Sequence, residues 1–402
     1  MRKIKYSSIV LTLISVMICG LCVYSYAGEV RGVTGDTIKI GLIVDMTGPA
    51  AAMEVVYAHA HKDYFQWVNE QGGIHGRKIK LLIEDERYTI PAAIAAFKKL
   101  VYRDEVLCIS GPGGTGQHTA LFSQLEKTKM PSFAISISPT MHTPYKRYVF
   151  ASAGDYVDFT GAIYDFVLNK MKAKAPKIAM VLPDTEAGKV VAEGARKYAS
   201  FYNQKYYSEV LNVGAVDATS QILRLKSEGV DNIVIAANIT DVVSTVLRTC
   251  RRFNYTPNVH GVHFACGDEV IEMTGDAAKN YYGVHALSQW HDDTPEMKKV
   301  REVFKKYHPN SKPPIGIHQM GWLWGIIISE GLKRAGKDVD SEKLVVALET
   351  LKDFDTGGLS GPITYTSKSH KATNYCKMYK TDMGKKRLVA ITGWIKPPEL
   401  KE

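Results

Sequence analysis

The most constraining feature of this sequence is a regular alternation of short β-branched runs with segments of helical period. Glycine, proline, aspartate or serine stands at each junction, which is typical of the turns between strands and helices. Because parallel strands need a crossover between them, the alternation predicts βαβ units and a parallel sheet. The strands predicted for the first such unit are Ile38–Val44, Lys78–Glu84, Val106–Ile109 and Ser132–Ser136.

The same alternation begins again after Ala151 and predicts a second doubly wound α/β unit. Its predicted strands are residues 178–182, 207–211, 232–236 and 259–264. Three helix-like segments (295–307, 317–334 and 341–351) and two strand-like segments (373–380 and 388–392) follow. A chain of 402 residues has room for two domains, and no flexible linker separates the two units. We therefore expect two α/β lobes that share a cleft.

The N-terminal segment has the pattern of a secretory signal peptide. Basic residues within the first five positions precede an apolar stretch from Ile9 to Val23, and Ala27 ends a small-residue cleavage site. We expect cleavage near Ala27, which would remove residues 1–27 and release an exported protein. The alternative is a retained anchor, because the uncharged span is long enough to cross a bilayer.

Composition and motifs argue against several function classes. The formal net charge of +10 is modest, and the basic runs stand singly, so we expect no nucleic-acid partner. His59 and His61 are two positions apart and diverge on a helix, which does not favour a metal site. Neither a G-x-S-x-G elbow nor an H-E-x-x-H motif is present. The sequence predicts no catalytic residue, no metal and no cofactor.

Four cysteines follow the predicted cleavage site: Cys108, Cys250, Cys266 and Cys376. They allow three pairings if all of them bridge. None has the C-x-x-C spacing of a zinc or redox site, and Cys108 lies in an apolar run where a buried thiol is expected. In an exported protein a disulfide is favoured, and we expect Cys250 to pair with Cys266.

A glycine-rich loop, Gly111 to Gln117, follows one predicted strand and precedes a predicted helix. It fits G-x-G-x-x-G, but dinucleotide binding also needs an acidic residue at the end of the next strand, which ends at Ser136. Backbone N–H groups at a helix N-terminus suit a small carboxylate. The alternative is a tight turn that binds nothing.

Three hydroxyl residues, Ser136, Ser138 and Thr140, follow the neighbouring strand at a spacing of two. Their hydroxyl groups are suited to hydrogen bonds with a bound solute. Side chains of this kind also cap local turns, so both roles stay open at this stage.

The order of these pieces resembles one family. The residues that carry the resemblance are Ile40-Gly41-Leu42-Ile43 with Thr47-Gly48-Pro49, the stretch from Trp67 through Asn69-Glu70-Gln71-Gly72-Gly73 to Gly76-Arg77-Lys78-Ile79, and Ile83 to Glu86 before Pro91. They are similar to those of the periplasmic solute-binding proteins of ABC importers, specifically the branched-chain amino-acid-binding type with the type I periplasmic-binding fold.

The resemblance implies an α/β fold of two doubly wound parallel-sheet lobes joined by three hinge crossovers. It divides the chain into a signal peptide (1–27), lobe 1 (28–150 and 287–360) and lobe 2 (151–286 and 361–402). It implies a monomer that holds a small amino acid or related aliphatic or aromatic carboxylate between the lobes and delivers it to a membrane permease. A soluble sensor of the same fold is one alternative, and an exported α/β enzyme is another.

The resemblance also implies a set of solute-binding positions. They are Met53, Gly113, Gly114, Thr115, Ser136, Ser138, Thr140, Asn238 and His263. The chain departs from the family pattern in lobe 2. Ala187 and Asn238 stand where the family has aromatic residues, and His263 stands where it has the acidic partner of the solute's ammonium. Asp268 or Glu269 supplies that charge if the register shifts, so it stays open whether the solute carries an amino group.

Overall fold

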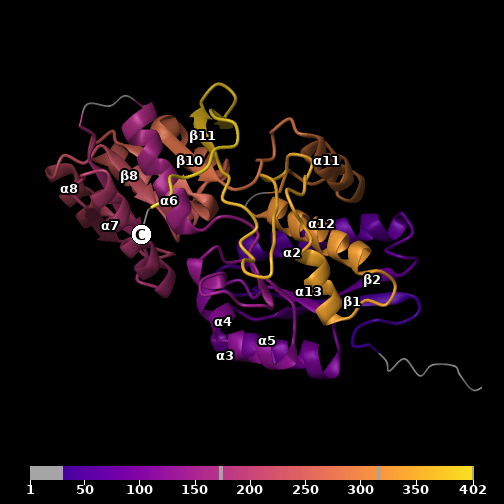
Figure 1. Cartoon of the computed structure of the whole chain (residues 1–402). Helices are drawn as coiled ribbons and strands as arrows, with labels where there is room; N and C mark the ends of the chain where they lie inside the picture. The colour runs from indigo at the N-terminus through magenta and orange to yellow at the C-terminus, as the bar shows by residue number, and fades with distance from the viewer. Residues whose placement is uncertain (1–29, 172–174, 315–316, 401–402) are drawn as a thin grey trace, which may run out of the picture.

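The computed structural model describes residues 30–171, 175–314 and 317–400 and has two α/β lobes (Figure 1). The predicted signal peptide lies outside the described residues. One sheet is built from the first part of the chain, and the other from the middle and the C-terminal part. The predicted fold class, two doubly wound α/β lobes, is confirmed.

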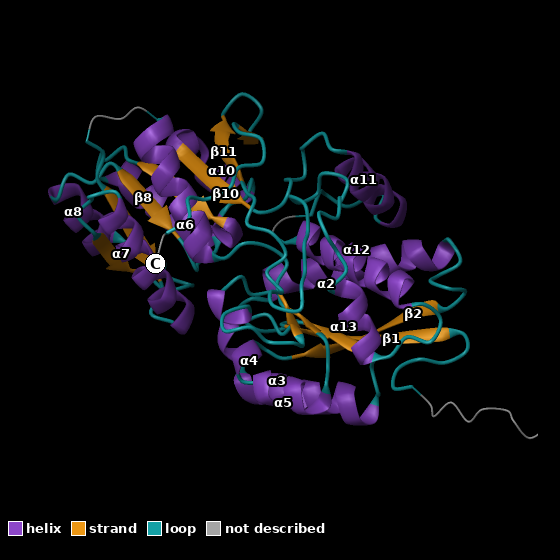
Figure 2. Ribbon diagram, in the orientation of Figure 1, coloured by secondary structure: helices purple, strands orange, loops and turns teal. Residues whose placement is uncertain are grey.

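Lobe 1 contains a parallel five-stranded sheet in the order β2-β1-β3-β4-β5. Its strands are β1 (Thr37–Val44), β2 (Lys78–Asp85), β3 (Cys108–Ser110), β4 (Ser132–Phe133) and β5 (Val149–Phe150). The helices between them are α2 (Ala51–Glu70), α3 (Ile90–Lys98), α4 (Thr115–Thr119) and α5 (Phe122–Thr128). Figure 2 shows α2 on one face of this sheet and α3 with α5 on the other.

Side chains of β1 alternate between two apolar layers, as the period of a strand requires. Ile40 and Leu42 belong to the large apolar cluster that includes residues of α2, whereas Ile43 packs with Phe97 and Leu100 on the opposite face. Both layers are fully shielded from solvent, which explains why β1 reads as a nearly continuous apolar run.

Lobe 2 contains a seven-stranded sheet in the order β12-β11-β10-β9-β8-β6-β7. Its strands are β6 (Ile178–Leu182), β7 (Tyr207–Val210), β8 (Asn232–Ile235), β9 (Asn258–Val262), β10 (Tyr281–His285), β11 (Lys377–Asp382) and β12 (Arg387–Ala390). Its helices are α6 (Tyr156–Asp165), α7 (Glu186–Phe201), α8 (Thr219–Ser227), α9 (Thr240–Arg252) and α10 (Glu269–Thr274). β6 to β10 run parallel, whereas β11 and β12 are antiparallel to their neighbours.

The C-terminal part of the chain serves both lobes. Its helices are α11 (Pro295–Tyr307), α12 (His318–Ala335) and α13 (Ser341–Leu348). α11 and α12 pack on α2, and α13 packs on α12, so all three cover lobe 1, whereas β11 and β12 complete the sheet of lobe 2. Trp322 and Trp324 of α12 are fully buried, and the Trp324 indole N–H donates to the carbonyl of Ala134 at 3.1 Å.

Three segments connect the lobes, after β5, after β10 and between α13 and β11. The first and third segments form an isolated bridge between Ala151 and Lys371, and the second and third form another between Leu287 and Ser360. The three connections therefore lie side by side and form a narrow hinge region. The exact boundaries predicted for the two lobes stay a prediction.

The structure differs from the sequence-based expectations in local detail. β5 and β10 were not predicted, because β5 has only two residues and the Tyr281–His285 segment carries no clear alternation. One helix was expected at about 119–127, but two short helices, α4 and α5, occupy this region. These differences do not change the assignment of two α/β lobes.

Candidate functional site

The loops at the carboxyl ends of β1 to β4 gather at one edge of the lobe 1 sheet, because all these strands are parallel. α4, which directly follows the glycine-rich loop, packs against α7 of lobe 2. Figure 1 shows the two helices at the place where the lobes approach each other. This edge of lobe 1 is therefore the candidate solute site.

The predicted hydroxyl residues form one connected chain at this edge. The Oγ1 atom of Thr115 lies 2.7 Å from the Oγ atom of Ser136. The backbone N–H of Ser138 donates to the Ser136 hydroxyl at 3.2 Å, and the Thr140 hydroxyl donates to the Ser138 Oγ atom at 3.0 Å. The structure thus brings together four side chains that the sequence singled out.

Ser138 also has the local role that we considered from the sequence. It is the N-cap of a short 3₁₀ turn, Pro139–Met141, and its hydroxyl accepts from the backbone N–H of Thr140 at 3.4 Å. Ser136 and Ser138 are almost completely buried. Their hydroxyl groups therefore stabilise the loop at this edge of lobe 1.

The glycine-rich loop holds an acidic side chain of the protein itself. The backbone N–H of Gly113 donates to the Oε1 atom of Glu86 at 3.0 Å. We expected this N–H to bind the carboxylate of a solute. In the structure the carboxylate of Glu86 occupies that position.

Three carboxylates are buried around Gly113: those of Asp45, Glu54 and Glu86 are each at most 2% exposed. The Oε2 atom of Glu54 accepts from the Asp45 backbone N–H at 2.7 Å. The Asp45 carboxylate in turn accepts from the N–H of Thr47 at 3.2 Å and of Ala50 at 2.8 Å. These three residues are called the acidic cluster below.

Burial changes the protonation of this cluster. Burial, with the nearby carboxylates of Asp45 and Asp85, raises the pKa of Glu86 to about 7, although the N–H groups of Gly113 and Gly114 oppose the rise. Burial also raises the pKa of Glu54 well above its usual range, and the charges of Glu86 and Asp45 contribute. At neutral pH the cluster therefore has less negative charge than three free carboxylates would have.

Sequence reasoning missed the acidic cluster, although a signal was present. Asp45 directly follows β1 and Glu86 directly follows β2, so both stand at the carboxyl ends of parallel strands. Glu54 stands next to Met53 on α2, and the Met53 side chain is partly buried against the main apolar cluster. The strand-end rule applied to acidic residues would have identified two of the three.

In lobe 2, the structure places Asn238 in the loop between β8 and α9. Its side chain is 2% exposed, and its Nδ2 atom donates to the carbonyl of Leu211 at 3.1 Å. Its Oδ1 atom is buried and has no partner among the described residues. Asn238 therefore ties two loops of lobe 2 together and keeps one acceptor free.

His263 lies in a 3₁₀ turn directly after β9 and is 1% exposed. Its ring stacks on that of His285 with the ring centres 4.2 Å apart, and Phe264 meets it edge-on at 4.5 Å. Burial lowers the pKa of His263 well below its usual range, so the ring is neutral at physiological pH. Both ring nitrogens are buried and have no partner in the described part of the chain.

The two acidic residues that we considered as alternatives to His263 have partners within lobe 2. An Oδ1 atom of Asp268 accepts from the backbone N–H of Leu388 at 2.6 Å, which fixes the start of β12. Burial raises the pKa of Glu269, and a hydrogen bond from Thr240 opposes the rise. Both residues contribute to packing among α10, α9 and β12.

The predicted disulfide between Cys250 and Cys266 is not formed in the structure. Both residues are free, buried thiols, as are Cys108 and Cys376. Cys250 belongs to α9, whereas Cys266 follows the 3₁₀ turn after β9. Each side chain packs in the apolar core of lobe 2. The prediction of a disulfide, which was based on export of the protein, was therefore wrong for this pair.

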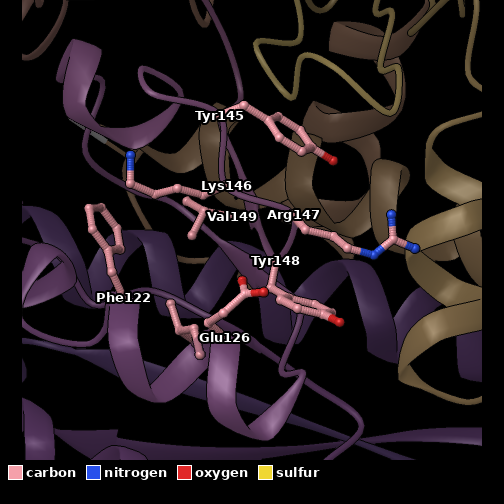
Figure 3. Close-up of a pocket in the computed structure, with 8 residues that line it drawn as sticks. Phe122, Glu126, Tyr145, Lys146, Arg147, Tyr148 and Val149 are labelled. Atoms are coloured by element: carbon pink, nitrogen blue, oxygen red, sulfur yellow. The ribbon is translucent and has the colours of Figure 1, made fainter.

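A separate cavity of about 400 Å³ lies on lobe 1, between α5 and the segment that leads into β5 (Figure 3). Phe122, Leu125 and Val149 supply its apolar lining. Lys146 lies over the ring of Phe122 and donates to the carbonyl of Thr140 at 2.8 Å, and Arg147 pairs with Glu349 at 3.3 Å. The cations at this cavity are therefore already engaged within the protein.

Two further searches concern the described residues only. No group of three or more His, Cys, Asp or Glu side chains in residues 30–171, 175–314 and 317–400 is arranged to hold a metal ion. Within the same ranges, no helix combines the length and the apolar character that a membrane span requires.

Residues 37–386 match the family described as periplasmic binding protein. The chain belongs to the periplasmic binding protein family. A binding protein for leucine, isoleucine, valine, threonine and alanine from Pseudomonas aeruginosa is 25% identical over 358 residues, which cover 84% of this chain and 87% of the relative. A Leu/Ile/Val-binding protein homologue from Brucella abortus is 24% identical and covers 80% of this chain and 82% of its own length.

Solved structures with the same fold cover nearly the whole of this periplasmic binding protein. A fatty acid ABC transporter substrate-binding protein from Thermomonospora curvata has a TM-score of 0.82 at 22% identity, covering 92% of this chain and 95% of its own. A branched-chain amino acid ABC transporter protein from Thermus thermophilus with bound valine has a TM-score of 0.82 at 22% identity, covering 90% and 97%.

Family membership confirms the resemblance that the sequence motifs indicated. It leaves the individual site residues of this periplasmic binding protein as predictions. The structure brings Gly113, Gly114, Thr115 and the three hydroxyl residues to one edge of lobe 1. Asn238 and His263 are in lobe 2, at the carboxyl ends of β8 and β9.

Proposed function

We propose that this chain is the extracytoplasmic substrate-binding component of an ABC importer. It captures a small amino acid or a related solute between its two lobes and delivers it to a membrane permease. The observation that carries the proposal is the joining of two α/β lobes by three adjacent connections, with the carboxyl ends of the lobe 1 strands directed towards lobe 2. The similarity to an amino-acid-binding protein and to two solved structures of ABC transporter proteins supports it.

Hinge closure is the proposed mechanism. A solute bound first to lobe 1 gains further contacts from lobe 2 in the closed form, which shifts the population towards closure. Micromolar affinity corresponds to about 8 kcal/mol, which a few charge-assisted hydrogen bonds and an enclosed apolar wall provide. We propose no chemical step, and thus no catalytic residue, for this function.

The export of the protein belongs to the same proposal. We propose that residues 1–27 direct secretion and that cleavage near Ala27 releases the mature chain into the periplasm. Mass spectrometry of protein from a periplasmic fraction tests this point. We expect the mass of a chain that begins at Gly28, whereas the mass of the full chain would indicate a retained anchor.

The function is tested on mature protein that is unfolded, washed free of bound solute and refolded. Thermal unfolding is followed in the presence of amino acids, aliphatic acids, aromatic acids and amides, and small-angle scattering reports the radius of the particle. A solute present at about 100 times its Kd adds about 2.7 kcal/mol of stability. We expect one solute class both to raise the Tm and to make the protein more compact.

Reconstitution distinguishes an importer from a sensor of the same fold. The mature protein and the radiolabelled solute are added outside vesicles that contain the candidate ABC permease and enclosed ATP. Uptake that depends on the binding protein supports the importer. Tight solute binding without uptake would favour the sensor, and conversion of the solute to a product would favour the enzyme.

A further inference from the structure

The acidic cluster has no ion-pair partner in the part of the chain that the structure describes. Asp45, Glu54 and Glu86 form no ion pair with a Lys, Arg or His among the described residues. A carboxylate this deeply buried is ordinarily paired with a cation, coordinated or protonated. Backbone N–H groups already donate to Asp45 and Glu54, so the unfilled requirement of the cluster is on Glu86.

The missing donor belongs at the Oε2 atom of Glu86. Glu86 is fully buried, and its Oε1 atom is satisfied by the N–H of Gly113. Its Oε2 atom is buried and has no hydrogen-bond partner in the part of the chain that the structure describes. An acceptor left unpaired in this way costs free energy, and a hydrogen-bond donor from a ligand would relieve that cost.

Glu54 approaches the same point from the other side. A Cβ atom built on Gly113 would lie 1.8 Å from the Oε1 atom of Glu54, so the Glu54 carboxylate rests directly on the Gly113 backbone. Glu54 and Glu86, which come from α2 and from the end of β2, thus converge on one glycine. Two carboxylates that meet at a shared point suit a group with several N–H donors.

A carboxylate of the solute fits this position poorly. It would compete with Glu86 for the N–H of Gly113, and it would bring a further negative charge beside three buried carboxylates. Of the Thr115 and Ser136 hydroxyl groups, one donates to the other, which leaves this pair one donor fewer for an anion. The polarity of this edge is therefore the reverse of that expected from the family pattern.

We infer that the lobe 1 end of the cleft binds the amino group of the solute, through Glu86 and Glu54, instead of its carboxylate. This inference rests on the proposed function and specifies its substrate class as solutes with a primary ammonium or amide N–H₂ group. An amino acid then lies in the cleft with its amino end towards lobe 1. Its other end faces lobe 2, where the ring nitrogens of His263 have no partner among the described residues.

The test uses matched solutes that differ only in their charged groups. Leucine is compared with 3-methylbutylamine, which lacks the carboxylate, with leucinamide, and with 4-methylpentanoate, which lacks the amino group. Parallel sets are built on phenylalanine and alanine, and calorimetry gives the Kd of each. We expect the amine-bearing members of at least one set to bind, and its acid without an amino group to bind at least about tenfold more weakly.

Variants connect the preference to the named side chains. Glu86→Gln and Glu54→Gln keep the shape of each side chain but cannot take up the negative charge that a bound ammonium stabilises, so each should weaken binding of the amine-bearing members about 10- to 100-fold. Glu84→Gln is the matched control, because Glu84 stands two residues before Glu86 and pairs with Lys99. A circular dichroism spectrum and the Tm of each variant show whether it folds.

The outcomes separate the inference from the function on which it rests. Equal or tighter binding of the acid that lacks an amino group would overturn the inference and leave the importer function intact. So would unchanged amine affinity in a folded Glu86→Gln or Glu54→Gln variant, which would indicate protonated carboxyl groups that only stabilise the loop. Tight binding of Ca²⁺ alone would replace the amino group with a metal ion. If no member of the three sets binds, the inference is overturned, and the wider solute screen decides the proposed function separately.

Discussion

The Nζ atom of Lys371 lies 3.2 Å from the Oδ2 atom of Asp155, and both side chains are mostly buried in the hinge region. Lys371 belongs to the third connection between the lobes, and Asp155 begins α6 through a capping box with Asp158. His142, from the loop after β4, also lies 3.0 Å from Asp155. This ion pair therefore links lobe 1, the hinge and the first helix of lobe 2.

Removing the cation from this network should destabilise the protein strongly. In Lys371→Met, Asp155 and Asp158 lose their shared cation in a largely buried position, and we expect a loss of about 3 kcal/mol of unfolding free energy. Urea unfolding followed by fluorescence measures the change. Lys368→Met is the control, because Lys368 is exposed three residues earlier in the same connection. Equal urea midpoints for the two variants would show that the pair contributes nothing.

The acidic cluster predicts a specific pH dependence of the apo protein. The pKa of Glu86 rises from 4.5 to about 7 on burial, so between these values the folded protein holds a proton that the unfolded chain releases. The unfolding free energy must therefore fall as pH rises through this window, by about 3 kcal/mol in total for this one group. The charges that face Glu86 are those of Asp45, Glu54 and Asp85.

The comparison of wild type with Glu86→Gln isolates this contribution. Buried histidines such as His118 and His260 have pKa values lowered to about 3 and add the opposite trend on the acid side, but they are common to both proteins. We expect wild type to lose about 3 kcal/mol more than the variant between pH 4.5 and pH 8, measured by urea unfolding. Parallel pH profiles would mean that Glu86 titrates normally.

The four cysteines should behave as buried free thiols. Burial raises the pKa of Cys250 to about 12 and that of Cys266 well above its usual range, so neither forms a reactive thiolate at neutral pH. We expect the native mature protein to react very slowly with a thiol reagent. After unfolding in urea without a reductant, it should titrate four thiols per chain. A value of two would restore the disulfide that the sequence suggested.

Most of the fold could be predicted because its signals are local. The buried run of β1 and the paired glycines after α2 define a strand and a helix end without any knowledge of their neighbours. The predicted α11, α12 and α13 segments were also close to those observed. β5 escaped prediction because two residues carry no periodicity, and its place in the sheet depends on pairing with β4.

The site was predicted only in part, for a related reason. Thr115 and Ser136 are in contact because two parallel strands end side by side, which the strand order makes predictable. The approach of Glu54 and Glu86 to Gly113 depends on how α2 packs against the sheet, and that packing is not encoded in the spacing of the residues. The same limit explains why the predicted disulfide was wrong, since the separation of two cysteines in the sequence does not give the distance between their thiols.

Two glycines of the same loop should respond in opposite ways to alanine. At Gly113, a Cβ atom would lie 1.8 Å from the Oε1 atom of Glu54, whose other oxygen is held by the N–H of Asp45. Gly113→Ala should therefore cost about 2 kcal/mol of unfolding free energy and weaken solute binding, because it displaces a carboxylate of the acidic cluster.

At Gly116, on α4, the nearest atom to a new Cβ is 3.8 Å away, in Ile90. Gly116→Ala should be neutral or stabilising by up to about 1 kcal/mol, because alanine favours the helix. Thermal unfolding and calorimetry of both variants measure the difference, and a well-folded Gly113→Ala protein with normal affinity would show that Glu54 moves aside without cost.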